Sequence, residues 1–384
     1  MKSARFASWF LSAAFVALMA VPHLYEISGE GTDTTSVEKR QMAKMPELHR
    51  AIRDFSGFAR QFQSYYSDSF GLRSSLIHWN NLLRLRLLNE SAVPGVRVGL
   101  DGWLFYADEW ALENYENIMP LSPEEIERIE AVTTERRRWL EAKGIPLILV
   151  VAPEKHTIYS EFLPPGIHKL GKESRFDQVA AAFARHPEVE FIDTRPALLR
   201  AKSTQRLFHR TDTHWNDYGA FIGYGELMER LTRHFPKIGR HDIEDYTVSV
   251  TDKPGRDLAA MLSLTDVIRE EEIELIPKFT PRARDGQWPY PPLEDMPEVA
   301  GQEMVVKETG DPSLPRAGVF RDSFSWALIP FLAESFQRVV FVWTFDFLPE
   351  LIEREKPDVV IFECVERYLP SLAKENPPRM RAEL

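Results

Sequence analysis

The chain has 384 residues and a net charge of −11. Hydrophobic residues make up 44% of it, and aromatic residues make up 11%. This composition is typical of a folded protein with a sizeable core and excludes an intrinsically disordered one. The acidic balance, with no basic stripe to neutralise phosphates, argues against a nucleic-acid partner.

The N-terminus has the features of a secretory signal. Lys2 and Arg5 precede an apolar stretch at 6–21. The stretch is short for a membrane span of about 20 apolar residues, and it shows no clear cleavage site. We therefore expect 1–28 to be a signal peptide or signal anchor in a bacterial inner membrane, with the body in the periplasm. The alternative is a buried N-terminal helix. The polar residues 29–45 are expected to form a tether.

Helical periodicity begins after the tether and gives way to an alternation of strands and helices. Residues 46–88 carry the periodicity, and the glycine-bounded segment 99–106 predicts a turn and an aromatic strand. Further helices are predicted at 122–143, 175–184, 217–233, 323–336 and 346–355, and strands at 145–152, 189–192, 317–320, 338–343 and 358–363. This alternation predicts an α/β fold with a mostly parallel sheet covered on both faces.

The alternation is interrupted between about 236 and 315. Prolines, glycines and charged residues crowd this stretch, which predicts an insertion of loops and short strands beside the sheet. With the insertion included, 46–374 are expected to form one domain. Residues 375–384 are expected to be a C-terminal tail.

An acid and a histidine lie two positions apart in the middle of the chain. In an extended segment, Asp212 and His214 point to the same face. A carboxylate in that position orients an imidazole that acts as a general base. The alternatives are a histidine that caps a helix or packs against Trp215, and a metal site with His209. No further cluster of ligands supports the metal site, so we expect no metal.

A serine follows the predicted strand at 317–320. A strand-to-helix turn would place the Ser323 hydroxyl above the carboxyl edge of the sheet, where α/β proteins keep reactive groups. The amides of Ser323 and Phe324 would then face a developing oxyanion. Ser325 is a rival, and a helix-capping role for Ser323 is the alternative. If this turn meets the acid and the histidine, the three form a triad for acyl transfer.

Six short motifs occur in order along the chain. They are Glu38-Lys39-Arg40, Asp68-Ser69-Phe70-Gly71-Leu72-Arg73, Asp101-Gly102-Trp103-Leu104-Phe105-Tyr106, Pro153-Glu154-Lys155, Asp212-Thr213-His214-Trp215 and Asp322-Ser323-Phe324. Together they resemble the AlgJ/AlgX family of polysaccharide O-acetyltransferases over about 35–370. The chain ends soon after the last predicted strand, where AlgX carries a carbohydrate-binding module, so it looks closer to AlgJ.

The resemblance implies a fold, an activity and roles. The fold is an SGNH-hydrolase-like three-layer sandwich with a circularly permuted sheet. Asp212 would be the orienting acid, His214 the base and Ser323 the nucleophile, and no cofactor is needed. The acceptor would be an exported polysaccharide such as alginate, and the acetyl donor would be supplied by a membrane-bound O-acyltransferase. An acetyl esterase with the same triad, or a non-catalytic glycan-binding component of a secretion complex, stays open.

Four more residues are candidate substrate contacts, namely Arg321, Lys155, Arg367 and Trp215. Arg321 replaces the glycine that the wider hydrolase superfamily has before Asp-Ser. It would stabilise the oxyanion or contact an acidic sugar, and the alternative is a salt bridge to Asp322 or Glu363. Lys155 and Arg367 follow predicted strands at the edge where a cleft is expected. Ion pairs that stabilise the fold are the alternative for both.

Overall fold

The computed structural model describes Trp9, Val16 and residues 43–49, 53–69, 72–293 and 304–377. The chain divides into two compact units, Met1–Val96 with Gly255–Ile268, and Arg97–Pro254 with Arg269–Leu384. Apart from Trp9 and Val16, the predicted signal segment 1–28 lies outside the described residues, as does the tether up to residue 42. Among the described residues, none of the helices has the length and hydropathy of a membrane span.

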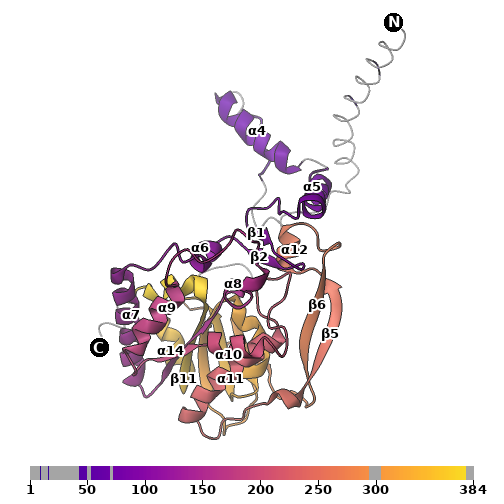
Figure 1. Ribbon diagram of the computed structural model, residues 1–384. Coiled ribbons are helices and arrows are strands. Elements are labelled where there is room, and N and C mark those ends of the chain that lie inside the picture. The colour runs from indigo at the N-terminus through magenta and orange to yellow at the C-terminus, as the bar shows by residue number, and fades with distance from the viewer. Residues whose placement is uncertain are drawn as a thin grey trace. The chain divides into compact units, whose positions relative to one another are not determined.

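The first unit is helical, as the periodicity at 46–88 predicts (Figure 1). It contains α4 (Phe55–Ser69), α5 (Arg73–Leu88) and α12 (Asp257–Met261). Two polar side chains of α5 join it to the segment that follows α12. Asn81 Nδ2 donates to the carbonyl of Leu262 at 2.7 Å, and His78 Nδ1 lies 2.8 Å from the carbonyl of Ser263. Because the hydrogen bonds bridge more than 170 positions of sequence, only the folded unit brings these residues together.

A seven-stranded sheet runs through the second unit in the order β4-β3-β11-β9-β10-β8-β7. Its strands are β3 (Leu147–Ala152), β4 (Glu190–Asp193), β7 (Arg284–Asp285), β8 (Val305–Glu308), β9 (Arg316–Arg321), β10 (Arg338–Trp343) and β11 (Val359–Val365). The five strands from β4 to β10 are parallel, whereas β8 and β7 are antiparallel and extend one edge. The sheet is therefore mixed, and its parallel part is the part that the sequence predicts.

Helices cover both faces of this sheet and give three layers. One face carries α7 (Pro123–Glu141), α9 (Arg175–Ala184) and α14 (Pro349–Glu355), and the other carries α10 (Arg195–Ala201), α11 (Asp217–His234) and α13 (Ile329–Ala333). Alternate residues of β3 enter opposite cores: Leu147 and Leu149 face α7, whereas Ile148 and Val150 face α11. Burial on both faces explains why the sequence of β3 is continuously apolar.

Side-chain caps fix where the long helices begin. Ser122 accepts from the N–H of Glu125, whose carboxylate accepts in turn from the N–H of Ser122, and Pro123 occupies the first helical position of α7. Asn216 accepts from the N–H of Gly219 at the start of α11. Both starts were predictable because capping depends on residues only three positions apart.

The predicted insertion at 236–315 contains longer strands than expected. β5 (Tyr246–Pro254) and β6 (Arg269–Pro277) are nine residues each and form an antiparallel ribbon at the edge of the unit in Figure 1. The remaining short elements of the second unit are β1 (Val96–Val98), β2 (Leu104–Tyr106), α6 (Ala111–Tyr115), α8 (Lys155–Ile158) and the 3-10 helices η1 (Ser160–Phe162), η2 (Ile243–Asp245), η3 (Ser323–Ala327) and η4 (Glu366–Ala373). Strands β7 and β8 join the main sheet instead of lying beside it.

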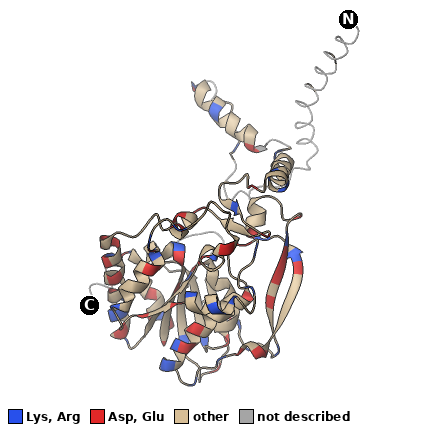
Figure 2. Ribbon diagram, in the orientation of Figure 1, with Lys and Arg blue, Asp and Glu red and all other residues tan. Residues whose placement is uncertain are grey.

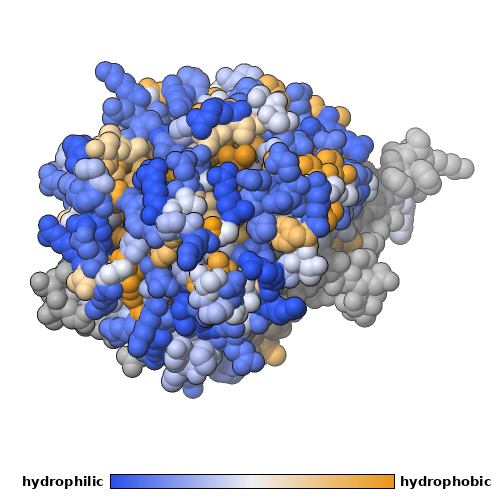
Figure 3. All heavy atoms as spheres, turned by 90° about the horizontal axis from the view of Figure 1, so that it is seen from below, coloured by the Kyte–Doolittle hydropathy of each residue, from blue (hydrophilic) through white to orange (hydrophobic). Residues whose placement is uncertain are grey.

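The surface of the second unit is polar and of mixed charge. Acidic and basic residues alternate over its helices and loops without a basic stripe (Figure 2). Seen from below, hydrophilic side chains cover most of the unit, with small hydrophobic areas between them (Figure 3).

Candidate active site

Asp212, His214 and Ser323 form a continuous chain of hydrogen bonds in the second unit. His214 Nδ1 lies 2.7 Å from Asp212 Oδ1, and His214 Nε2 lies 2.7 Å from Ser323 Oγ. Asp212 Oδ1 also accepts from the backbone N–H of His214 at 3.0 Å. Since the carboxylate occupies Nδ1, Nε2 is the nitrogen placed to take the hydroxyl proton. The three residues that were expected to meet do so.

The serine stands at the carboxyl end of a central strand. β9 lies between β11 and β10, and Ser323 follows it after one residue. The helix predicted at 323–336 is divided into the 3-10 helix η3 and the short α13, which carries Pro330 in its first turn. Ser323 itself is partly exposed, so its hydroxyl is accessible from solvent.

Asp322 fixes the shape of this turn through the backbone. Its Oδ1 accepts from the N–H of Phe324 at 2.8 Å, and its Oδ2 accepts from the N–H of Val365 on β11 at 2.7 Å. The expectation that the Phe324 amide faces an oxyanion is therefore wrong, because the adjacent carboxylate has captured that donor as a helix cap. The same role for the amide of Ser323 stays a prediction.

Ser325, the rival serine, points into the protein. It is fully buried, and its hydroxyl donates to Glu363 Oε2 at 2.6 Å. Burial and the nearby charge of Asp322 raise the pKa of the Glu363 carboxyl well above its ordinary value. Burial also raises the pKa of Asp322. Two carboxylates thus support the turn from below, and only Ser323 presents its hydroxyl to the histidine.

Trp215 connects the two segments that meet at the site. Its Nε1 donates to the carbonyl of Phe324 at 2.9 Å, and its ring packs against the backbone of α11. A Cβ at Gly223 would lie 3.0 Å from that ring, so glycine at this position permits the close approach. Trp215 is 1% exposed. This placement does not support the predicted substrate contact and gives Trp215 a positioning role.

Lys155 holds the loop that carries Asp212. Its Nζ donates to the carbonyls of His209 and Arg210, both at 3.1 Å, and to that of Asp212 at 2.6 Å. An ammonium has three donors, and three carbonyls take them here. The side chain is 1% exposed. The predicted substrate contact is therefore not supported, because the charge is used to order the backbone beside the carboxylate.

Glu270 also holds this loop, and no sequence pattern predicts that role. This fully buried carboxylate accepts from the N–H of Arg210 at 3.2 Å and from the N–H and hydroxyl of Thr211 at 2.8 and 2.7 Å. Arg206 Nη1 lies 3.2 Å away. Glu270 belongs to an acidic run on β6, so nothing local distinguishes it from its exposed neighbours.

Arg321 is buried beneath the turn. Its guanidinium stacks 4.2 Å from the ring centre of Trp326 and 4.9 Å from that of Trp343, and it donates to the carbonyl of Asp322 at 3.0 Å. Burial lowers the pKa of Arg321 to about 10. With no exposed surface it cannot touch a sugar in this structure. Its contact with Asp322 is to the backbone, so the expected salt bridge is not what holds it.

Arg367 forms buried ion pairs, as the alternative reading of this residue expects. Its Nη1 lies 2.5 Å from Glu154 Oε1, and its Nε lies 3.1 Å from Glu109 Oε2. The guanidinium also lies over the rings of Phe324 and Tyr106. These neighbouring charges raise the pKa of Arg367 above its ordinary value despite its burial. Arg367 therefore supports the turn after Ser323, and a sugar contact is not supported.

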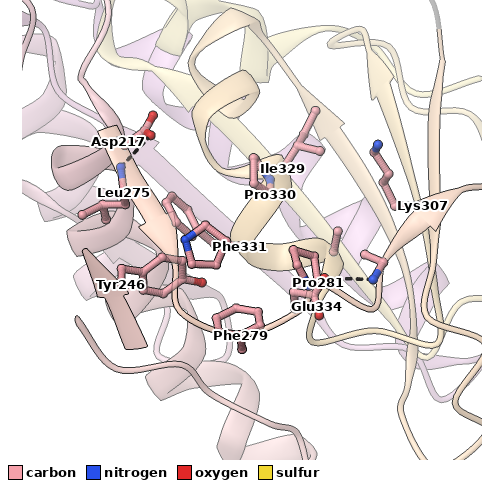
Figure 4. Close-up of a pocket in the computed structure, with 13 residues that line it drawn as sticks. Asp217, Tyr246, Leu275, Phe279, Pro281, Lys307, Ile329, Pro330, Phe331 and Glu334 are labelled. Atoms are coloured by element: carbon pink, nitrogen blue, oxygen red, sulfur yellow. Dashed lines mark hydrogen bonds between the residues drawn. The ribbon is translucent and has the colours of Figure 1, made fainter. Parts of the chain in front are cut away.

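A cavity of about 310 Å³ opens elsewhere in the second unit (Figure 4). Aromatic rings of Tyr246, Phe279 and Phe331 form much of its wall, and Asp217 and Lys307 lie at its rim. No member of the hydrogen-bonded chain lines it. Its lining contains no serine, cysteine or histidine, so we assign the chemistry to the edge of the sheet and not to this cavity.

Comparison with known families places the chain. The family model described as SGNH hydrolase-like domain, acetyltransferase AlgX matches residues 96–289, about half of the chain. The matched part contains Asp212 and His214 and ends before Ser323. The serine is therefore assigned from the geometry of this chain.

Relatives and solved structures agree with that match. The protein named "Probable alginate O-acetylase AlgJ" of Pseudomonas syringae pv. tomato is 26% identical over 84% of this chain and 84% of its own length. The protein of the same name from Pseudomonas fluorescens is 24% identical over 83% of each chain. The structure of Bacillus cereus PatB1 shares the fold, with a TM-score of 0.52 and 19% identity over 70% of this chain and 95% of that one. The expected resemblance to the AlgJ/AlgX family is confirmed, as is the expectation that the chain is closer to AlgJ. The chain belongs to the AlgX family of SGNH hydrolase-like acetyltransferases.

Proposed function

We propose that this acetyltransferase moves an acetyl group through Ser323 onto hydroxyl groups of an exported polysaccharide. The observation that supports the proposal is the chain of two 2.7 Å hydrogen bonds from Asp212 through His214 to Ser323. Such a chain is what nucleophilic acyl transfer needs, because a serine hydroxyl is a weak nucleophile until a base removes its proton.

In the first half-reaction, His214 Nε2 takes the Ser323 proton while Oγ attacks the acetyl carbonyl. The tetrahedral intermediate collapses when the leaving group departs with the proton from His214, and the acetyl group stays on Oγ as an ester. Asp212 holds the Nδ1–H and stabilises the charged imidazole. The amide of Ser323 is the backbone donor assigned to the oxyanion, since that of Phe324 is engaged by Asp322.

In the second half-reaction, a sugar hydroxyl replaces the leaving group. His214 Nε2 takes the proton of the hydroxyl, its oxygen attacks the acetyl ester, and Ser323 leaves with that proton to restore the resting state. The cycle balances without a metal or a cofactor. If water took the place of the sugar, the same residues would perform the esterase reaction, which is the alternative function.

The names of the relatives support the proposed acceptor, and the N-terminal sequence supports the proposed cellular location. The relatives are named alginate O-acetylases, so alginate or a similar polysaccharide is the proposed acceptor. The apolar stretch at 6–21 after two basic residues supports a periplasmic enzyme tethered to the inner membrane. A membrane-bound O-acyltransferase is the proposed source of the acetyl group, by resemblance to the family.

The test is an acetyl-transfer assay on the full chain with an activated acetyl ester and alginate oligosaccharides. We expect more acetyl groups to be gained by the oligosaccharide, as measured by its mass, than are released as free acetate. Release of acetate without any gain in oligosaccharide mass would establish the esterase. Ser323→Ala should abolish both. Ser325→Ala is the matched control, because Ser325 is two positions away and buried, and it should retain transfer. Full transfer by Ser323→Ala would overturn the proposal.

A further inference from the structure

Helix α5 leaves several large apolar side chains exposed although two of its polar side chains face inward. Its polar residues Asn81 and His78 face inward, where they bond to the carbonyls of Leu262 and Ser263. Asn81 is 3% exposed. A helix that packs on a core usually buries its apolar face and leaves amides and imidazoles in water. Here hydrogen bonds fix two polar side chains to the unit beside the half-buried Ile77, Leu82 and Leu85, and a second set of apolar side chains is left outward.

The outward face is a continuous apolar stripe. Leu76, Trp79, Leu83 and Leu87 are 55%, 59%, 55% and 74% exposed. Their spacings of three, four and four residues place all four within about 80° of arc on the helix surface. Large apolar patches that stay exposed on a folded unit mark an interaction surface.

The charged residues of α5 itself, leaving histidine aside, are all arginines. α5 contains Arg73, Arg84 and Arg86 and no Asp or Glu, although the whole chain has a net charge of −11. Arg84 and Arg86 are exposed, and helical geometry puts them on opposite flanks of the stripe. Leucines and a tryptophan between flanking arginines fit the boundary between acyl chains and anionic headgroups, since arginine extends its charge toward the phosphates.

We propose that α5 lies on the surface of an anionic bilayer, with Leu76, Trp79, Leu83 and Leu87 in the acyl boundary and Arg84 and Arg86 at the headgroups. The charge decides the occupant. A second copy of this chain would bring another set of arginines against the first, and anionic phosphates neutralise them instead. This inference rests on α5 alone and holds whether or not Ser323 is the nucleophile.

The test places a fluorophore on α5 of the full chain in vesicles. Leu83→Cys carries an environment-sensitive dye, and Val250→Cys on β5 is the matched control because it is apolar and 56% exposed. The native Cys364 is buried, and burial raises the pKa of its thiol, so it does not compete for the label. The vesicles contain phosphatidylcholine with or without phosphatidylglycerol, and lipids with a nitroxide near the headgroup quench a dye that reaches them.

With phosphatidylglycerol present, we expect blue-shifted emission and quenching several-fold stronger at position 83 than at position 250. Arg84→Glu with Arg86→Glu should return position 83 to the level of the control, because each basic residue near an anionic surface contributes about a factor of five to binding. Circular dichroism and the thermal unfolding midpoint of each variant verify that the fold is kept.

Three results would overturn the proposal. Equal exposure of positions 83 and 250 in anionic vesicles would remove the lipid contact. Blue-shifted emission of the dye at position 83 without lipid, increasing with protein concentration, would assign the stripe to a second copy. A blue shift at position 83 that appears only with an added membrane protein, and is the same in vesicles without phosphatidylglycerol, would assign the stripe to a protein partner.

Discussion

The segment that carries His214 and the turn that carries Ser323 are both fixed by buried ionisable side chains, but the two sets differ in kind. On the histidine side, Lys155 donates to backbone carbonyls and Glu270 accepts from backbone N–H groups, so opposite charges hold one loop. On the serine side, Asp322 and Glu363 are both acids. The nearest guanidinium in the turn, that of Arg321, bonds to a carbonyl.

The difference suggests that the two halves of the site respond to different changes. Loss of one charge on the histidine side leaves backbone groups without partners next to the orienting acid, so it should disturb the geometry of catalysis. On the serine side, burial raises the pKa of both carboxyls. The serine turn is therefore the half whose stability should depend on pH.

The largest expected effect is the loss of the hydrogen-bonded chain itself. His214→Ala and Asp212→Asn should lower kcat/KM for an activated acetyl ester by roughly 10⁴-fold, because the base or its orientation is removed. His241→Ala is the matched control, since this histidine stacks on Phe279 away from the site. A control variant that loses as much activity as His214→Ala would show that general instability, and not chemistry, was measured.

Lys155→Met should have the next largest effect. Three buried carbonyls would lose their donor, which is expected to lower the free energy of unfolding by about 2–3 kcal/mol. A fall of about 100-fold in kcat with unchanged KM would follow from the displaced Asp212. Lys202→Met, which removes a partly exposed lysine bonded to Ile158 and Glu161, should change neither by much. If KM alone rises, Lys155 binds substrate after all.

Glu270→Gln should produce a smaller loss from the same side. Glutamine keeps one oxygen, so it can replace either Oε1, which accepts from Arg210, or Oε2, which accepts twice from Thr211, but not both. We expect roughly a tenfold loss of kcat, and no loss in the exposed neighbour Glu271→Gln. Stopped-flow measurement of acyl-enzyme formation would show whether the loss occurs in the first half-reaction. Equal rates in both variants would show that Glu270, and with it the β5–β6 ribbon, has no role in catalysis.

The serine side gives the smallest effect at neutral pH but a distinct pH dependence. The folded protein keeps a proton on Glu363 above the pH at which the unfolded chain releases it, since the pKa is raised. That contribution to stability is complete below pH about 4.5 and is lost as the pH rises through the folded pKa. Glu363→Gln should therefore lose less unfolding free energy than the parent as the pH rises above about 4.5, as measured by urea denaturation. A slope identical to that of the parent would contradict this account.

Much of the framework could be predicted because its causes are local. Capping residues three positions apart start α7 and α11, and mainly apolar runs define the central strands β3, β10 and β11. The spacing of Asp212 and His214 and the place of Ser323 after β9 also carry their own signal. These features need no knowledge of distant parts of the chain.

The rest depends on contacts that no short window of sequence contains. Glu270 reaches the loop at 210–211 across about 60 positions, and Lys155 reaches it across more than 50. Arg321 and Trp215 were expected at the substrate because of their residue types, yet packing places both in the interior. The strands of the β5–β6 ribbon are charged and pair mainly with each other, so their length did not appear as an apolar pattern.

The most direct test of the account is to map the acetyl group on the enzyme. The full chain would be mixed with an activated acetyl ester, quenched in acid within one turnover and digested for mass spectrometry. The account predicts acetyl on Ser323, discharged when oligosaccharide is added before the quench and absent in His214→Ala. Acetyl on another residue, or turnover with no acetyl-enzyme in the parent chain, would contradict it.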